Sequence, residues 1–258
     1  MGARLGQHFL SDPSILRRIA AAAVERPDEL VLEIGPGQGT LTRALAERAS
    51  RVVAIETDRA LAAALAAACR GTGVTVIAGD ALKTPWPRAD VVCGNIPYRI
   101  TSPLIDRALR PPRPARIVFL VQAEVAERLA ARPGSPGYGA LTAGVHLVAT
   151  VERLFGVPAG AFRPRPRVDS AVVRLTPRAA PLVADEAEER RVRAVVQALF
   201  QRRRQQLARS VREAFGVERA ATAALLEGLG IEPAARVEGL APEAFVALAR
   251  ALGPHLAS

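Results

Sequence analysis

Short apolar runs alternate with stretches of helical period through the first half of the chain. The runs that suit buried strands are residues 30–34, 52–56, 74–78, 90–93 and 117–121. Between them, apolar positions recur at helical spacing in residues 41–49, 61–70, 103–109 and 124–131. This alternation is typical of an α/β fold with a mainly parallel sheet.

The pattern changes towards the C-terminus. Residues 151–157 and 170–175 read as two more strands with no clear helix between them, so we expect an antiparallel pair at the sheet edge. Beyond Pro177, residues 186–215, 219–229 and 242–252 are helical in period, with glycines and a proline between them. We therefore predict a sheet-containing domain over residues 1–178 and a smaller all-helical domain over residues 179–258.

Composition narrows the class of protein. Half of the 258 residues are apolar and 23% are charged, which predicts a folded globular chain rather than a disordered one. No apolar run has the length of a membrane span, and the first residues lack the apolar segment of a signal peptide. We expect a cytosolic protein without membrane attachment. The formal net charge of +10 favours a polyanionic partner such as nucleic acid.

The cysteines and histidines do not indicate a metal site. Cys69 and Cys93 allow at most one disulfide and have no second pair at zinc-site spacing, so both are expected to be buried apolar residues. His8, His146 and His255 are isolated in sequence. We predict no bound metal.

A glycine-rich stretch follows the first predicted strand. It reads VLEIGPGQGTLT and places Gly35, Gly37 and Gly39 where the strand turns into a helix. Glycines there let a ligand approach the backbone, and the helix start offers free N–H groups. The spacing is not that of the dinucleotide motif G-x-G-x-x-G, and a tight strand-to-helix turn explains the glycines alone equally well.

Polar side chains end the next three strands. They are Glu56, Asp80 and Asn95. Carboxyl ends of parallel strands line the crevice where such sheets bind ligands, and carboxylates there suit a ribose and an adenine amine. Each residue alone could be a helix cap, but the series is better explained by an adenosine-containing cofactor. Without a pyrophosphate cradle, S-adenosylmethionine is favoured and NAD is the alternative.

The stretch after the fourth strand reads GNIPYRITSP. The exocyclic amine of a nucleobase is a poor nucleophile, and two acceptors favour a pyramidal nitrogen. The Asn95 side-chain oxygen and the Ile96 carbonyl, aimed by Pro97, suit this role. Tyr98 offers a ring on which a base can stack. A strand-ending turn with a buried tyrosine is the alternative, and the preceding acidic strand ends favour the catalytic interpretation.

These motifs together resemble the rRNA adenine N6,N6-dimethyltransferases, in particular the bacterial enzymes that modify small-subunit rRNA. The similarity also includes GQHFLSDPSIL, AIETD, GDAL, VQAEVAERL, AFRPRPRVDSAVVRL, FQRRRQQLARSV and GLGIEPAARVEGLAPEAF. The macrolide-resistance methyltransferases share the catalytic half, where isoleucine at the position of Ile96 is common, but their C-terminal sequences differ. The resemblance implies a Rossmann-like class I methyltransferase sheet followed by the helical domain.

The resemblance also implies a cofactor site for S-adenosylmethionine. In it the opening segment covers the methionine end, the glycines form the floor, the first strand-end carboxylate holds the ribose, and the second, with its neighbour, holds the adenine. The residues so assigned are Gln7, His8, Leu10, Gly35, Gly37, Glu56, Asp80, Ala81 and Asn95.

The resemblance further implies a target site and a reaction. Asn95, Ile96, Pro97 and Tyr98 would grip the amine, and Phe162 would sandwich the flipped adenine against Tyr98. The implied reaction is transfer of two methyl groups to each of two adjacent adenines near the 3′ end of 16S rRNA, in an immature small ribosomal subunit, by a monomer.

A basic cluster in the helical part suits phosphate contact. Arg202, Arg203, Arg204, Arg209 and Arg212 fall in one predicted helix. An ordinary solvated helix is the alternative for any basic run. Two other functions stay open: a resistance-type enzyme acting on 23S rRNA, and a ribosome-assembly factor in which binding matters more than catalysis.

Overall fold

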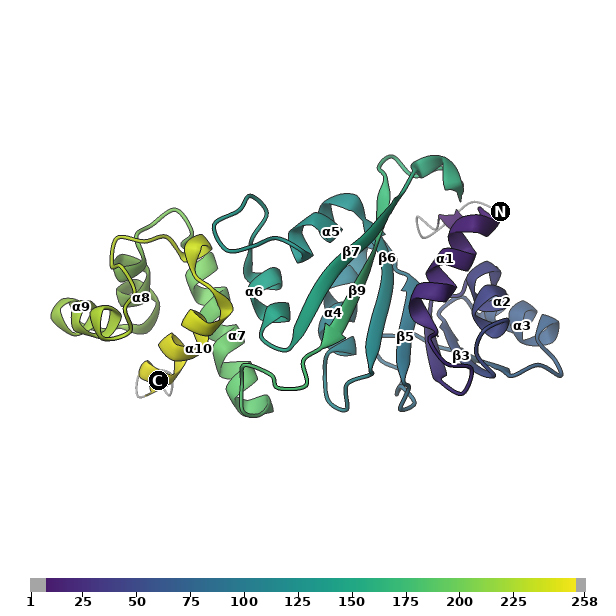
Figure 1. Ribbon diagram of the computed structural model, residues 1–258, viewed down its shortest axis with the longest axis horizontal. Coiled ribbons are helices and arrows are strands. Elements are labelled where there is room, and N and C mark those ends of the chain that lie inside the picture. Colours follow the sequence, from purple (N-terminus) through teal and green to yellow (C-terminus); the bar gives the residue numbers. More distant parts are fainter. Residues whose placement is uncertain (1–7, 254–258) are drawn as a thin grey trace. The chain divides into compact units, whose positions relative to one another are not determined.

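The computed structural model describes residues 8–253, which divide into two compact units (Figure 1). One unit contains the chain up to residue 126 together with residues 151–177. The other contains residues 127–150 and the described chain from residue 178 onwards. The chain passes from the first unit to the second after residue 177, close to the predicted boundary near residue 179. Residues 127–150, which were predicted to belong to the sheet domain, group with the helical unit.

The first unit is built on a seven-stranded sheet. Its order is β4 (Val74–Ala78), β3 (Arg51–Glu56), β2 (Leu30–Ile34), β5 (Val91–Asn95), β6 (Arg116–Gln122), β9 (Ser170–Pro177) and β7 (Ala149–Val157). Strands β2 to β6 pair in parallel, and β9 runs antiparallel to β6. Strand order reverses between β2 and β5, which is where sheets of this kind open a ligand crevice. The five predicted core strands are confirmed, and the two later strands lie side by side at the edge.

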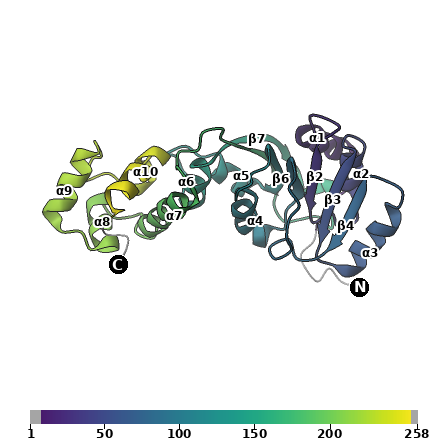
Figure 2. The ribbon, with the colours of Figure 1, turned by 90° about the horizontal axis from the view of Figure 1, so that it is seen from below.

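Helices flank this sheet (Figure 2). They are α1 (Pro13–Ala23), α2 (Thr40–Ala46), α3 (Arg59–Ala68) and α4 (Thr101–Ala108), whereas α5 (Ala123–Leu129) crosses from this unit into the other after Ala126. Val31 and Val91 of the strands form one core cluster with Ile19 of α1 and Leu45 of α2. The next residue along β2, Leu32, is also fully buried, on the opposite face. Burial on both faces explains why the strands read as continuous apolar runs.

Helix α1 is absent from the expectations above, although its start carries a clear signal. The Asp12 carboxylate accepts hydrogen bonds from the backbone N–H groups of Ser14 and Ile15, and Pro13 occupies the first turn. An aspartate cap followed by proline is a strong helix start. Just before it, the two-residue strand β1 (Phe9–Leu10) pairs antiparallel with β8 (Phe162–Arg163), which ties the opening segment to a distant part of the chain.

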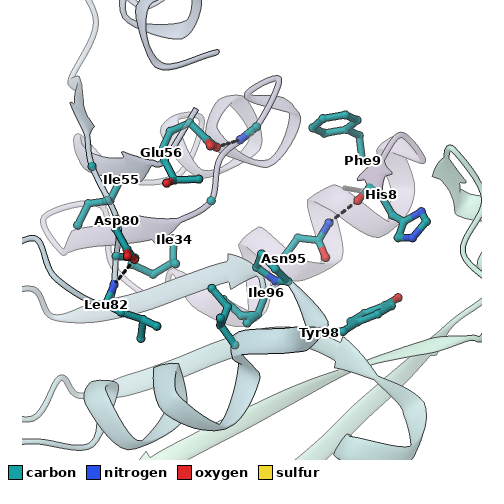
Figure 3. Close-up of a pocket in the computed structure, with 17 residues that line it drawn as sticks. His8, Phe9, Ile34, Ile55, Glu56, Asp80, Leu82, Asn95, Ile96 and Tyr98 are labelled. Atoms are coloured by element: carbon teal, nitrogen blue, oxygen red, sulfur yellow. Dashed lines mark hydrogen bonds between the residues drawn. The ribbon is translucent and has the colours of Figure 1, made fainter. Parts of the chain in front are cut away.

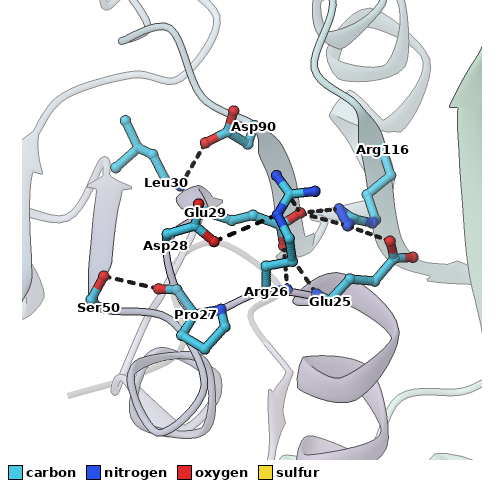
Figure 4. Close-up of polar contacts among 9 residues, drawn as sticks. All are labelled: Glu25, Arg26, Pro27, Asp28, Glu29, Leu30, Ser50, Asp90 and Arg116. Atoms are coloured by element: carbon cyan, nitrogen blue, oxygen red, sulfur yellow. Dashed lines mark hydrogen bonds and ion pairs between the residues drawn. The ribbon is translucent and has the colours of Figure 1, made fainter.

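A buried ion pair lies near the amino ends of β2 and β6 (Figure 4). The glycine-rich turn follows the other end of β2. The Arg116 guanidinium nitrogens lie 2.8 and 2.7 Å from Glu29 Oε1, and both side chains are almost fully buried. The other Glu29 oxygen accepts from the backbone N–H groups of Glu25 and Arg26. Arg116 also contacts the Glu25 carboxylate at 2.7 Å. The Glu29 carboxylate is thus surrounded by donors.

The second unit is helical in its described part. Its helices are α6 (Ala140–His146), α7 (Glu186–Phe200), α8 (Leu207–Phe215), α9 (Arg219–Gly228) and α10 (Pro242–Ala251). The rings of Tyr138, Phe200 and Phe245 pack in its core, and the Tyr138 hydroxyl donates to the Leu240 carbonyl at 3.0 Å. These contacts explain why the segment around α6 belongs to this unit.

The predicted single helix over residues 186–215 is wrong, because the chain turns between α7 and α8. The backbone N–H groups of Leu207 and Ala208 donate to the carbonyls of Ala235 and Pro233, so a distant loop satisfies the first turn of α8. Leu199 and Leu207, on either side of the turn, are both fully buried. Tertiary hydrogen bonds and burial therefore override helical periodicity here.

Candidate active site

A cavity of about 290 Å³ opens at the carboxyl ends of β2, β3, β4 and β5. It is built within the first unit alone. The structure brings ten predicted site residues to its lining: His8, Gly35, Gly37, Glu56, Asp80, Ala81, Asn95, Ile96, Pro97 and Tyr98. Figure 3 shows the two carboxylates of this set, Glu56 and Asp80, at one end and Tyr98 at the other.

The glycine-rich turn and Glu56 form one side of the cavity. Gly35 and Gly37 have φ angles of +69° and +55°, which glycine adopts without strain. A Cβ atom at Gly37 would lie 2.7 Å from the Phe9 ring, so any side chain there would force that ring to move. The Glu56 oxygens accept from the Gly37 and Asp58 N–H groups at 2.9 Å each. Each oxygen keeps acceptor capacity for a ligand hydroxyl.

A second carboxyl, Glu33, is buried beneath this turn on β2. Burial raises the pKa of Glu33 to about 8, and the nearby charge of Glu56 acts in the same direction. Glu33 is therefore mostly protonated at neutral pH. The negative charge facing the cavity at this side comes from Glu56 and not from Glu33.

Asp80 follows β4 and begins the loop that forms the wall next to Glu56. Its Oδ1 accepts from the Leu82 N–H at 2.9 Å, and its carbonyl accepts from the N–H groups of Lys83 and Thr84. The second carboxylate oxygen of Asp80 is the one left for an amine donor. Ala81 and Leu82 continue the wall with apolar surface, which suits a flat apolar ring.

Asn95 ends β5 in a defined orientation. Its Nδ2 donates to the His8 carbonyl at 2.9 Å (Figure 3). Because a carbonyl can only accept, the amide atom that faces the His8 carbonyl must be Nδ2. Oδ1 is then the atom able to accept a hydrogen bond from a ligand. The Ile96 N–H donates to the Leu120 carbonyl at 3.1 Å, which fixes the backbone just before Pro97.

Tyr98 stands at the mouth of the cavity with its ring partly exposed. Its hydroxyl lies 3.0 Å from Ser170 Oγ. The ring of His8 stacks at a centroid distance of 6.2 Å and an interplanar angle of 30°. His8 is itself held by a 2.8 Å hydrogen bond from Nδ1 to the Pro164 carbonyl. The aromatic neighbour of Tyr98 in this structure is therefore His8.

Three predicted residues are not in the cavity lining. Phe162 is 1% exposed and belongs to the core cluster, since its pairing with Leu10 turns its side chain inward, so the structure does not place it across from Tyr98. Leu10 is buried too, and its carbonyl accepts from the Thr40 hydroxyl. Gln7 lies outside the described residues. Phe9 lines the cavity, although it was not among the predicted site residues. The sequence signal that could have indicated Phe9 is its position next to His8.

The remaining cavity chemistry is that of main chain, amide, carboxylate and aromatic groups. Among residues 8–253, no group of three or more histidine, cysteine, aspartate or glutamate side chains is arranged to hold a metal ion. Cys69 and Cys93 are free and buried, as expected from the sequence.

Comparison with known proteins gives matches over almost the whole chain. The family model described as ribosomal RNA adenine dimethylase matches residues 2–253. The ribosomal RNA small subunit methyltransferase A of Nitratidesulfovibrio vulgaris is 42% identical over 257 residues, covering 96% of this chain and 95% of the relative. A dimethyladenosine transferase structure from Plasmodium falciparum has a TM-score of 0.84 at 30% identity, covering 93% of this chain and 96% of that chain.

A second solved structure is also similar. That of the 23S rRNA methyltransferase ErmE has a TM-score of 0.74 at 34% identity, covering 95% of this chain and 99% of that chain. These neighbours confirm the predicted class I methyltransferase sheet with a C-terminal helical region. The family match includes the glycine-rich turn, the acidic strand ends and the Asn95 motif, together with both helical and sheet units. The chain belongs to the ribosomal RNA adenine dimethylase family.

Proposed function

We propose that this protein uses S-adenosylmethionine to dimethylate the N6 amines of two adjacent adenines near the 3′ end of 16S rRNA, in an immature small ribosomal subunit. One observation carries the proposal: a single cavity connects two ligand-facing carboxylates to the oriented amide of Asn95, in a chain of the rRNA adenine dimethylase family. The name of the relative from Nitratidesulfovibrio vulgaris supports the small subunit as the substrate.

The cavity residues suit each part of the cofactor. The Glu56 oxygens can accept from the ribose hydroxyls, and the Asp80 carboxylate can accept from the adenine amine, beside the apolar wall of Ala81. Phe9 and Gly37 leave a narrow floor for the methionine end. When bound, S-adenosylmethionine supplies an electrophilic methyl group.

The residues at the other end suit the target amine. Asn95 Oδ1 and the Ile96 carbonyl can each accept one N–H of the amine, which localises the nitrogen lone pair. The Tyr98 ring can stack on the extruded base, a contact worth about 1–3 kcal/mol. Since the nitrogen becomes acidic once alkylated, these residues need no strong general base beside them.

The helical unit offers arginines for phosphate contact. Arg203 and Arg204, in the turn between α7 and α8, and Arg212 on α8 are exposed, and within residues 8–253 they have no ion-pair partner. Arg209 and Arg202 instead lie 2.6 and 3.8 Å from the Glu213 carboxylate. The three unpaired arginines are therefore the stronger candidates for binding RNA.

Replacing Arg203, Arg204 and Arg212 with glutamine is expected to weaken RNA binding mostly at low salt. Each lost phosphate contact should reduce the magnitude of the negative slope of log affinity against log salt by about one unit, measured by filter binding over a salt series. Arg209→Gln is the matched control, because Glu213 already neutralises Arg209. An unchanged slope for the triple variant would exclude these residues from the interface.

The proposal includes a monomeric, cytosolic enzyme. The cavity is completed by one copy of the chain, which supports action as a monomer. In the part of the chain that the structure describes, no helix has both the length and the apolar character of a membrane span.

A second candidate is a resistance-type enzyme that acts on large-subunit rRNA. The similarity to ErmE over nearly the whole chain supports this candidate, so the experiment below includes large-subunit RNA. A third candidate, an assembly factor whose binding matters more than catalysis, is favoured if an Asn95→Ala protein still supports subunit maturation.

The decisive experiment incubates the purified protein and S-adenosylmethionine with undermethylated small subunits and, separately, with large-subunit RNA. Nucleosides are then analysed after digestion. We expect N6,N6-dimethyladenosine from the small subunits only. Dimethyladenosine from the large-subunit RNA alone would favour the second candidate, and a methylated cytosine or guanine would refute both.

A further inference from the structure

The loop after β4 forms the wall of the cavity at the end assigned to the adenine. Asp80, Ala81 and Leu82 line the cavity, and the chain then continues to Trp86 without a regular strand or helix. Within the loop, the N–H groups of Lys83 and Thr84 both donate to the Asp80 carbonyl. Those bonds shape a turn, but they leave the carbonyls of Ala81, Leu82 and Thr84 to side-chain donors.

Two side chains that do not line the cavity bind these carbonyls. The Arg107 guanidinium donates to the carbonyls of Leu82 and Thr84, the latter at 2.6 Å. The Trp86 indole N–H donates to the Ala81 carbonyl at 2.9 Å. Arg107 also lies over the Trp86 ring, 5.0 Å from its centroid. The two side chains thus form one unit, the Arg107–Trp86 pair, which fixes the backbone of the wall.

The location of Arg107 connects this wall to the target site. Arg107 lies on α4, which begins at Thr101, shortly after Tyr98. Burial lowers the pKa of Arg107 and the charge of Arg110 adds to this, while the charge of Asp80 opposes both. Arginine nevertheless stays charged in proteins, so a cation is held behind the carboxylate that faces the adenine position. Neither Arg107 nor Trp86 lines the cavity.

We propose that Arg107 is a positioning residue for the adenine end of the cofactor cavity. It acts through Trp86 and the loop carbonyls. It fixes the position of the loop at residues 80–86 relative to α4, the helix that follows the Asn95 motif. This inference rests on the proposed function, because it takes the ligand at Asp80 to be the adenine of S-adenosylmethionine.

The test is cofactor binding measured by calorimetry without RNA. For Arg107→Gln we expect the Kd for S-adenosylmethionine and for S-adenosylhomocysteine to rise about tenfold, as for loss of charge-assisted hydrogen bonds. The Kd for methylthioadenosine, which lacks the amino-acid end, should rise by the same factor. Turnover at saturating cofactor should fall less than about threefold, since Asn95 and Tyr98 are untouched.

Three further variants separate positioning from general effects. Arg110→Gln removes an equal charge from an exposed neighbour and should leave every Kd unchanged. Arg107→Lys keeps the charge but cannot bind both carbonyls in the same planar geometry, so it should behave more like Arg107→Gln than like the unmodified protein. Trp86→Phe keeps a ring beneath Arg107 and loses only the bond to Ala81, so its Kd should rise by a smaller factor, about threefold.

A readout in the cofactor-free protein completes the test. The backbone amides of residues 81–84 and of Trp86 should exchange faster in Arg107→Gln, while the melting temperature changes little. An unchanged Kd in a folded Arg107→Gln protein would overturn the inference, as would an equal rise for Arg110→Gln. Failure to methylate small subunits, with these binding effects intact, would contradict the proposed substrate alone. If the unmodified protein bound no S-adenosylmethionine, both proposals would fall.

Discussion

Replacing Asn95 with alanine is expected to lower kcat by a factor of about 10² or more, as for loss of a preorganised transition-state partner. The amide is held by its bond to the His8 carbonyl, which leaves Oδ1 as the acceptor for the target amine. This acceptor matters most when the amine nitrogen becomes pyramidal, so the loss should appear in kcat more than in KM. The measurement is single-turnover methylation of undermethylated subunits at saturating cofactor.

Two control variants separate the acceptor role of Asn95 from its hold on the opening segment. Asn95→Asp keeps an acceptor oxygen but cannot donate to the His8 carbonyl. His8→Ala keeps that carbonyl and removes the ring beside Tyr98, together with its bond to the Pro164 carbonyl. If holding His8 were the whole role, Asn95→Asp would be as inactive as Asn95→Ala through weakened cofactor binding.

Glu56→Ala should show the reverse pattern, a raised cofactor Kd, because Glu56 also holds the Gly37 N–H. Near-normal methylation by Asn95→Ala would reject the proposed role.

The acidic strand ends were predictable because their placement follows from local pattern and sheet geometry. Each of Glu56, Asp80 and Asn95 comes at or just after the end of an apolar run, and parallel strands bring such ends to one edge. The part of the cavity at these strand ends thus required no long-range contact to be known in advance. The roles of these residues towards cofactor and amine remain proposals.

The opening segment was less predictable, because its position depends on pairing between distant two-residue strands. Phe9 pairs with Arg163 and Leu10 with Phe162. Strands this short carry no periodic signal, and their register decides which side chain faces the cavity. That register turns Phe162 into the core and places Phe9 against the glycine turn. The resemblance had indicated the segment, and only the pairing shows which of its side chains reach the site.

The turn between α7 and α8 shows the same limit. Neither glycine nor proline interrupts residues 201–206, so the sequence continues the helical period. The turn depends on carbonyls of residues 233 and 235, which are distant in sequence. Its consequence is functional, because Arg203 and Arg204 lie on an exposed turn while Arg209 lies on a helix beside Glu213.

The largest expected effect on stability comes from the ion pair at the amino ends of the strands. Replacing Arg116 with methionine removes the buried cation beside the Glu29 carboxylate and leaves only the exposed Arg26 guanidinium at 3.7 Å, and we expect a loss of about 3–5 kcal/mol in the free energy of unfolding. The backbone N–H groups of Glu25 and Arg26 still donate to Glu29 in this variant. We therefore expect a loss near the lower end of this range. The free energy of unfolding is measured by denaturant titration followed by circular dichroism. If the two units unfold in separate transitions, the transition of the sheet unit is the one compared.

The neighbouring pair supplies a matched control for this prediction. Arg26 also approaches Glu29, at 3.7 Å, but its side chain is 65% exposed, so Arg26→Ala should cost less than about 1 kcal/mol. Glu29→Gln combined with Arg116→Met should recover part of the loss, because no charge is then left buried alone. The cofactor cavity lies at the other end of the strands, so cofactor affinity should be unchanged at temperatures where Arg116→Met stays folded. A loss for Arg116→Met no larger than that for Arg26→Ala would show that the buried pair contributes no more than an exposed one.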